Sequence, residues 1–191
     1  MDDTRSPGSH LVDAVLTGQP GAFERLVREH QGLCWHIILR MVRDPEVARE
    51  LCQETFLRVH RCLHQYRHES TLKTWIGRVA YSIALRHLRR KRIPLAGSGD
   101  DDGYALVENI SDGFDLETAC AEEEAGRHLH EAIEGLPPLQ RMLLTLYYFD
   151  EVPIPEIALI TGLASGTIKS HLFRSRLHLR SALETRTGVA V

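Results

Sequence analysis

The sequence predicts an all-α protein made of two small helical domains joined by a flexible acidic linker. Apolar residues recur at three- and four-residue spacings through most of the 191 residues, and no stretch alternates as a half-buried strand does. Residues 95–117 are rich in Gly, Ser and Asp, a composition typical of linkers. Beyond them, a short helix, a tight turn with Gly and a second helix follow in the order of a helix-turn-helix, although an ordinary helical corner would give the same pattern.

These signals divide the chain into four segments. Residues 1–20 form an N-terminal extension in which we expect no more than a short helical turn. The first domain spans 21–94, the linker 95–127 and the second domain 128–191. Because about thirty extended residues span up to ~100 Å, domains joined in this way can reach sites more than one DNA turn (~34–36 Å) apart.

Three helices are predicted in the first domain. The first covers 22–42, after which Asp44 serves as the N-cap of the second helix and Pro45 occupies its first position. A polar break at 67–71 separates the second helix from the third. The third helix runs over about 72–92, and an Ile-Pro pair closes it.

Four helices are predicted around the second domain. One ends before a Pro-Pro pair, and the next carries the apolar residues of 139–147. Pro155 lies in the first turn of a short third helix, which Gly162 ends. Ser165 can cap the last helix, which reaches about Leu183.

The outward face of the last helix suits a DNA groove. At about 100° per residue, cations, a hydroxyl and an aromatic ring gather opposite the apolar face. Lys and Arg can bond phosphates or guanine edges, and Phe can touch a thymine methyl. A contact with a partner protein would explain the exposed aromatic ring equally well. This face and its flanks comprise Thr167, Lys169, Ser170, His171, Phe173, Arg174, Arg176 and Leu177.

The outward face of the third helix is similar in character. Residues 86–92 include five cations, part of which can serve the helix dipole. Tyr81 beside these cations suits stacking on an unpaired base. The outward face comprises Arg78, Tyr81, Ser82, Leu85, Arg89 and Arg92.

Charge is unevenly distributed along the chain. The formal net charge of −3 argues mildly against a nucleic-acid partner. It amounts, however, to +6 over 1–94, −11 over 95–135 and +2 over 136–191. An acidic linker therefore hides two basic domains, and basic patches bind phosphates. A solvated charged surface beside an acidic linker is the alternative.

Three stretches of the chain resemble the extracytoplasmic-function (ECF) sigma factors, small sigma-70-type subunits of bacterial RNA polymerase. Residues 44–56, DPEVARELCQETF, look like the helix that docks on the polymerase clamp. Residues 74–80, TWIGRVA, with the helix that ends in LRR at 88–90, look like the reader of the −10 promoter element. The third stretch, which looks like the −35 helix-turn-helix, joins 136–137, Arg141, 156–158 and 166–176.

The resemblance covers residues 21–93, as sigma region 2, and 128–184, as sigma region 4. It implies a factor that binds core RNA polymerase and promoter DNA, directs initiation and needs no cofactor. The polymerase-binding residues it implies are Asp44, Glu50, Leu51, Gln53, Glu54 and Phe56. The −10 residues, with the loop 66–73 holding a flipped base, are His68, Ser70, Lys73, Arg78, Tyr81, Ser82, Arg86, Arg89 and Arg90. The −35 residues are Thr167, Lys169, Ser170, His171, Phe173 and Arg174.

Some positions depart from the pattern of the family. Ser82 stands where Asn is common, and Arg86 stands where an acidic residue is common. Pro153 and Pro155 stiffen the entry to the helix-turn-helix. For Glu50 and Glu54, the alternative to polymerase binding is a structural role, in which they cap the helix and keep the protein surface soluble. The resemblance also implies an anti-sigma factor, often membrane-bound, with envelope or metal stress as a fitting signal.

Other function classes are disfavoured. An enzyme is not expected, because the sequence contains no GxxxxGK[ST], GxSxG or HExxH motif. No metal site is predicted: a group of His and Cys residues has spacings that could bind a metal, but a His-rich surface explains it better. This group is His60, Cys62, His64 and His68. The alternative function is a free-standing two-domain helix-turn-helix regulator, which would bind promoter DNA without polymerase or respond to a metal.

The sequence also predicts the compartment. No apolar run approaches the ~18 residues of a membrane span, and no apolar stretch follows the N-terminus, so we expect neither membrane insertion nor export. The four cysteines form no CxxC pair, which indicates reduced thiols in the cytoplasm.

Overall fold

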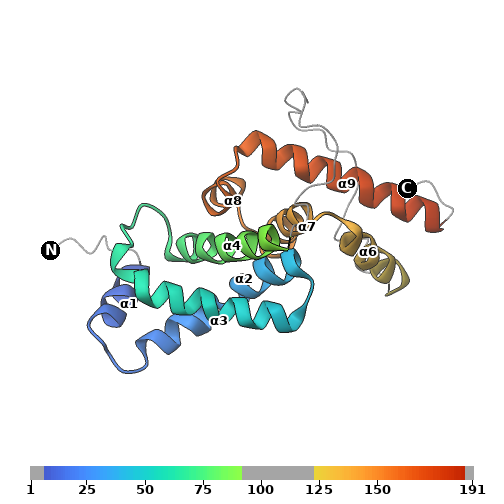
Figure 1. The fold of residues 1–191 in the computed structure, drawn as a ribbon. Coiled ribbons are helices and arrows are strands. Elements are labelled where there is room, and N and C mark those ends of the chain that lie inside the picture. Colours follow the sequence, from blue (N-terminus) through green and yellow to red (C-terminus); the bar gives the residue numbers. More distant parts are fainter. Residues whose placement is uncertain (1–6, 92–122, 188–191) are drawn as a thin grey trace.

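The computed structural model describes residues 7–91 and 123–187, and every regular element in these two ranges is helical (Figure 1). The predicted all-α fold class is confirmed. The predicted linker falls largely on 92–122, outside the described residues, as do Arg92 and Cys120. The domain bounds drawn from the sequence stay a prediction.

Residues 7–91 form the first half of the fold. α1 (Pro7–Leu16) is longer than the helical turn expected there, because its apolar side packs on α2 and on η1. α2 (Ala22–Val42) ends at Arg43, whose φ of 65° is left-handed. α3 (Pro45–Cys62) continues into the short 3₁₀ helix η1 (Leu63–Gln65), and α4 (Leu72–Arg90) follows a loop. The helices predicted from the sequence here are therefore present with nearly the expected bounds.

Residues 123–187 form the second half. α6 (Glu123–Gly135) precedes α7 (Pro138–Leu144), which continues as a π-helical turn, η2 (Thr145–Phe149). α8 (Ile154–Thr161) and α9 (Ser165–Thr187) make the predicted helix-turn-helix. Gly162 ends α8 with a left-handed φ of 75°, a conformation in which a side chain would be strained.

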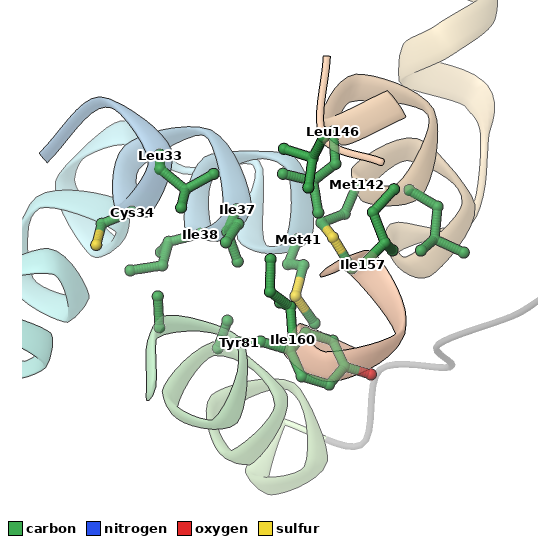
Figure 2. Packing of buried hydrophobic residues seen from close by; sticks show 14 of the residues in the cluster. Leu33, Cys34, Ile37, Ile38, Met41, Tyr81, Met142, Leu146, Ile157 and Ile160 are labelled. Carbon is green, nitrogen blue, oxygen red and sulfur yellow. The ribbon is translucent and has the colours of Figure 1, made fainter. Parts of the chain in front are cut away.

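The two halves share one hydrophobic core. α8 packs on α4, and α7 packs on α2 (Figure 1). Figure 2 shows Met142 and Ile160 of the second half close to Met41 and Tyr81 of the first. Ile160 approaches the α4 backbone because Gly77 has no side chain: a Cβ atom there would lie 3.2 Å from Cγ1 and Cδ1 of Ile160. No feature of the sequence indicated this contact, since the acidic linker pointed to two separate domains.

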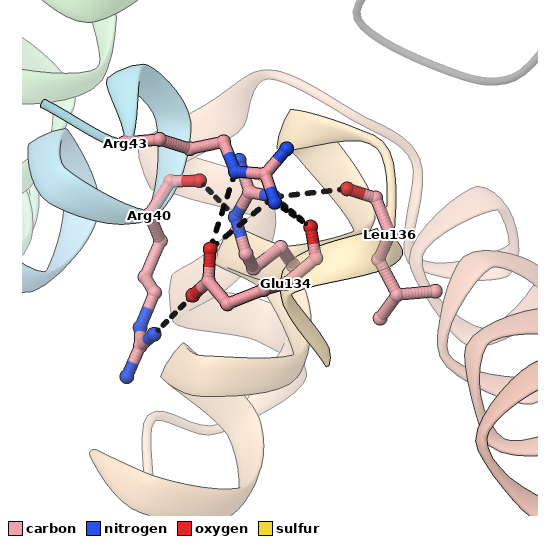
Figure 3. Close-up of polar contacts among 5 residues, drawn as sticks. Arg40, Arg43, Glu134 and Leu136 are labelled. Atoms are coloured by element: carbon pink, nitrogen blue, oxygen red, sulfur yellow. Dashed lines mark hydrogen bonds and ion pairs between the residues drawn. The ribbon is translucent and has the colours of Figure 1, made fainter. Parts of the chain in front are cut away.

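A charged cluster joins α2 to the C-terminal end of α6 (Figure 3). The Glu134 carboxylate accepts a hydrogen bond from Nη1 of Arg40 at 2.8 Å and one from Nε of Arg43 at 3.2 Å. Arg43 also donates to the Glu134 carbonyl. Because the C-terminal end of a helix carries partial negative charge, both cations are favourably placed.

Arg141 of α7 is fully buried beneath this cluster. Its Nη1 donates to the carbonyls of Glu134 and Leu136, each at 3.0 Å, and its Nε donates to the Arg40 carbonyl at 2.6 Å. Burial lowers the pKa of Arg141 to about 10, so the guanidinium still carries its charge at neutral pH. Arg141 therefore bonds mainly to its own half and only once to α2.

Two more polar contacts cross between the halves. His36 Nδ1 of α2 lies 2.6 Å from Oδ1 of Asp150. Thr74 Oγ1 of α4 donates to Oε2 of Glu156 at 3.0 Å. Polar contacts therefore accompany the apolar contact on both α2 and α4.

The Arg141→Ala variant is expected to lose at least about 3 kcal/mol of unfolding free energy, because the buried site loses three hydrogen bonds and the carbonyls of Arg40 and Leu136 are left without the donor that Arg141 supplies. Urea denaturation followed by circular dichroism measures this loss. Arg25→Ala is the matched control, since Arg25 is an exposed cation paired only with Glu29, and it should change stability by less than about 0.5 kcal/mol. Equal stability of the two variants would contradict the structural role of Arg141.

Candidate protein and nucleic-acid interfaces

Asp44 starts the helix predicted to meet polymerase. Its Oδ1 accepts hydrogen bonds from the backbone N–H groups of Glu46 at 3.0 Å and Val47 at 3.2 Å, and Pro45 occupies the first helical position. This is the N-cap predicted from the Asp-Pro pair. The Asp44 carboxylate thus has a local structural role whatever else it contacts.

An open, mostly apolar groove of about 760 Å³ lies between α2 and α3. α2 lines it with Phe23, Val27 and Trp35, and α3 lines it with residues that include Gln53 and Phe56. Gln53 is exposed, whereas Phe56 is buried at the groove wall. Two of the predicted polymerase residues therefore lie at one apolar depression.

The other predicted polymerase residues are placed differently. Leu51 is buried, so it supports α3 from inside, and Glu50 is exposed on the surface. The sequence reasoning missed Leu57, which lines the groove and is 59% exposed. Its position four residues after Gln53, on the same helical face, was the signal that could have identified it.

Glu54 of α3 is joined by an ion pair to Arg86 of α4. The sequence assigned Glu54 to polymerase and Arg86 to DNA, so the structure brings one residue of each predicted set together. Both side chains are close to half exposed, and each remains within reach of a partner. An acid at position 86, common in the family, would instead repel Glu54.

The loop before α4 is ordered by an aromatic cluster. The Tyr66 hydroxyl donates to the Ser70 carbonyl at 2.6 Å, and the Tyr66 ring lies 4.5 Å from the His68 ring and 5.5 Å from the Trp75 ring, measured between centroids. His68 has a left-handed φ of 59°. Thr71 then caps α4 by accepting from the backbone N–H of Thr74 at 3.1 Å. Aromatic faces and a polar loop thus lie together where the sequence predicts a base pocket.

Most of the predicted −10 residues on α4 are exposed, but Tyr81 is not. The expectation that Tyr81 lies on the outer face was wrong: its side chain is only 8% exposed. The helical period was read correctly, but α8 covers this side of α4 (Figure 2). Burial accordingly raises the pKa of Tyr81. The exposed members of the set on α4 are Lys73, Arg78, Ser82, Arg89 and Arg90.

α9 offers a narrower polar face than the sequence predicted. Lys169 is exposed, and Thr167, Ser170, Phe173 and Arg174 are half-buried. The Arg174 Nε donates to the Ser170 carbonyl at 3.4 Å. His171, expected at the edge of this face, is buried; only 7% of it is exposed, because α9 packs on the other helices of its half along that edge. In this conformation His171 is not available to a DNA groove.

Among the described residues, the cysteine and histidine side chains form no metal-binding group. Within 7–91 and 123–187, no group of three or more His, Cys, Asp or Glu side chains is placed to hold a metal ion. His60 packs edge-on against the Phe23 ring, with centroids 4.8 Å apart. Burial raises the pKa of the Cys34 thiol, and it raises that of Cys52 to about 11, so both thiols stay protonated at neutral pH.

None of the helices in the described part of the chain is both long and apolar enough to span a membrane.

Two family models match the two halves of the chain. The model described as Sigma-70 region 2 matches residues 26–93, and the one described as Sigma-70, region 4 matches residues 127–179. Among curated proteins, the RNA polymerase sigma-H factor of Pseudomonas aeruginosa is 30% identical over 185 residues, covering 95% of this chain and 96% of that protein. The ECF RNA polymerase sigma-E factor of Escherichia coli K12 is 32% identical over 174 residues, covering 87% and 88%.

Solved structures share the fold at low sequence identity. CnrH, solved in complex with the cytosolic domain of CnrY, matches with a TM-score of 0.65 and 17% identity, covering 94% of this chain and 99% of CnrH. The sigma factor RpoE of Bartonella quintana, solved with the anti-sigma factor NepR, matches with a TM-score of 0.58 and 20% identity, covering 86% and 98%.

The Asp44→Ala variant is expected to lose about 1 kcal/mol of unfolding free energy, because two N–H groups at the start of α3 lose their acceptor. Asp44→Asn should stay within a few tenths of a kcal/mol of the natural chain, since Asn also caps helices. Urea titration of the three proteins checks this order. A stable Ala variant would show that the cap contributes nothing.

Proposed function

Because the chain belongs to the ECF sigma factors of the sigma-70 family, which direct promoter-specific initiation by RNA polymerase, we propose that three of its surfaces divide this task. The groove between α2 and α3 docks on core polymerase. The outer face of α4, with the loop at 66–71, holds the melted −10 strand. The polar face of α9 reads the −35 duplex. Polymerase performs the chemistry, so this chain acts in the cytoplasm as a non-enzymatic subunit without a cofactor.

The groove is the observation that carries the assignment to polymerase. Protein interfaces combine an apolar centre with a polar rim, and here the rings of Phe23 and Trp35 lie beside the exposed amide of Gln53. A regulator that acts on DNA alone has no use for an apolar depression away from its basic faces. The groove thus favours a polymerase subunit over the free-standing regulator, and Glu50 and Glu54 extend its polar side.

The −10 strand would be held by stacking and by charge. A base that leaves the melting duplex can stack on the Tyr66, His68 and Trp75 cluster, with Ser70 at the polar edge of the loop. The exposed cations of α4 would neutralise phosphates along the strand. Ser82 is shorter than the Asn common in the family, so we assign it only a phosphate or sugar contact. Arg86 reaches the strand once its pair with Glu54 is broken.

The −35 duplex would be read by the start of α9. Lys169 is the exposed cation of this face, so it fits a phosphate contact. Ser170, Phe173 and Arg174 fit base edges in the major groove, where a guanidinium bonds guanine and an aromatic ring touches a thymine methyl. Thr167 lies at the first turn of the helix, where DNA-reading helices commonly present their contacts.

An anti-sigma factor is the proposed regulatory partner. The chain shares its fold with CnrH and with RpoE of Bartonella quintana, whose structures contain CnrY and the anti-sigma factor NepR. A membrane-bound anti-sigma factor with a cytosolic domain fits this likeness, because it would meet the chain in the cytoplasm.

Run-off transcription with purified core polymerase tests the function as a whole. A pool of genomic fragments should yield discrete transcripts only when the chain is added. No promoter-dependent transcript from any fragment would contradict the proposed function, and tight promoter binding without polymerase would favour the free-standing regulator instead.

The Leu57→Asp variant should weaken binding to core polymerase about tenfold, because it places a carboxylate at the apolar groove. Leu16→Asp is the matched control, since Leu16 is 51% exposed on α1 but does not line the groove. Co-purification and fluorescence titration with polymerase check the difference, with circular dichroism to confirm both folds. Equal affinities would remove the groove from the interface.

The Arg174→Ala variant should weaken −35 binding by about 1–3 kcal/mol and relax the sequence preference at one position. Lys169→Ala should weaken binding uniformly across sequences and lower the salt dependence, as loss of a phosphate contact does. Arg180→Ala, which removes a cation of the same helix paired with Glu184, serves as the control. Footprinting of polymerase complexes on promoter variants separates these outcomes.

A further inference from the structure

We propose that the ion pair between Glu54 and Arg86 couples polymerase docking to capture of the −10 strand within the first half of the fold. A cation of polymerase that engages Glu54 releases Arg86 for a phosphate of the strand, so the two partners bind cooperatively. This inference rests on the proposed functions of α3 and α4. It gives Glu54 a second role, as a positioning residue that controls the charge and the reach of Arg86.

The pair connects two helices that pack on each other. Nη2 of Arg86 on α4 donates to Oε1 of Glu54 on α3. The Arg86 side chain is 41% exposed and the Glu54 side chain is 46% exposed, so a polymerase side chain or a phosphate can reach either one. Both residues lie in the first half, so the pair does not depend on the position of the second half.

Each partner lies at the edge of its own proposed surface. Gln53, which lines the polymerase groove, directly precedes Glu54 in α3. On α4, Ser82 and Arg89 are exposed four residues before and three residues after Arg86, and these spacings place all three on one helical face. The pair therefore joins the rim of the groove to the outer face of α4.

The charges around Glu54 favour a cation as its partner on polymerase. Glu46, Glu50 and Glu54 are exposed and follow one another at four-residue spacing, so they give the start of α3 an acidic edge. His87 of α4 feels the charge of Glu50, but burial lowers the pKa of its imidazole, which is therefore mostly neutral at neutral pH. A lysine or arginine of polymerase thus fits the acidic edge, and Arg86 is the cation that it displaces.

Two effects give the coupling a positive sign. In the pair, the Glu54 carboxylate occupies donors of Arg86 and repels an approaching phosphate, because the two anions have like charge. A cation that binds Glu54 weakens both effects, and a phosphate that binds Arg86 frees Glu54 in turn. The pair has to be separated only once for two binding events, so by linkage each partner tightens the binding of the other by the same factor.

The strength of the pair limits the size of the coupling. Exposed ion pairs are weak, and their usual strength corresponds to a factor of about two to five in a binding constant. An acidic residue at position 86, which is common in the family, cannot form this pair. The coupling is therefore expected where a cation stands at that position, as in this chain.

Docking on core polymerase without DNA gives the first test. Arg86→Ala should strengthen docking about two- to fivefold, because Glu54 no longer has to leave a partner. Arg25→Ala is the matched control: it removes an exposed cation paired with Glu29 on α2, and it should leave the affinity within about 1.5-fold. Fluorescence titration measures both affinities, and circular dichroism verifies the folds. Unchanged or weaker docking of the Arg86→Ala variant would overturn the inference.

Anisotropy binding of a −10 single-strand oligonucleotide gives the second test. In the free chain, Glu54→Gln should raise strand affinity about two- to fivefold, because it releases Arg86 and removes a negative charge. At saturating core polymerase, the same substitution should change strand affinity by less than about 1.5-fold, because polymerase already engages Glu54. Glu46→Gln is the control for the lost charge, since Glu46 pairs with Arg49 of its own helix, and it should alter neither affinity.

The double variant Glu54→Gln with Arg86→Ala completes a thermodynamic cycle. Equal effects of Glu54→Gln on strand binding with and without polymerase would contradict the coupling. If the free chain binds no strand, the docking test decides alone. Strand binding that never depends on Arg86 would refute its −10 role, and docking unchanged by Glu54→Gln even in the double variant would refute the polymerase role of Glu54. Promoter-dependent run-off transcription would in both cases still support the function as a whole.

Discussion

The close approach of α8 to α4 depends on Gly77 having no side chain. Ile160 lies where even a methyl group at position 77 would be crowded, and this places α8 directly against the helix backbone. The approach fixes the position of the second half, since α7 and α9 pack on α8 or on each other. The burial of Tyr81 follows from the same contact. One glycine thus links the packing of the core to the accessibility of a proposed DNA-binding surface.

The polar groups around the contact between α4 and α8 differ from one another in how far they are buried. Glu134 accepts from two arginines at the end of α2, and its exposed fraction leaves these bonds in competition with water. Arg141 is fully buried, yet two of its three carbonyl acceptors belong to its own half. Arg141 therefore stabilises mainly the second half, with one bond to α2, whereas the pairs that Glu134 makes with Arg40 and Arg43 compete with water.

Local signals in the sequence predicted the helices well, because each boundary depends on neighbouring residues. Asp44 caps α3, and Gly162 ends α8 through a left-handed residue, as their chemistry requires. The exposure of Tyr81 and of His171 could not be predicted in this way. Each depends on an element distant in sequence or on the packing of a whole half, and helical periodicity shows only which residues share a face. The contact of Gly77 with Ile160 joins residues 83 positions apart, and the acidic stretch between them gave no sign of it.

Acidic side chains pair with several cations of the first half in the folded chain. The sequence divides into basic, acidic and basic segments, and Glu134 belongs to the acidic one. In the folded chain, Glu134 meets Arg40 and Arg43, and Glu54 meets Arg86, so several cations of the first half already have acidic partners. Cations held in this way are less available to phosphates, and non-specific DNA binding depends on such cations. The Glu54–Arg86 pair lies within the first half, whereas the pairs of Glu134 with Arg40 and Arg43 join the two halves, so the acidic partners of these cations come from both parts of the chain.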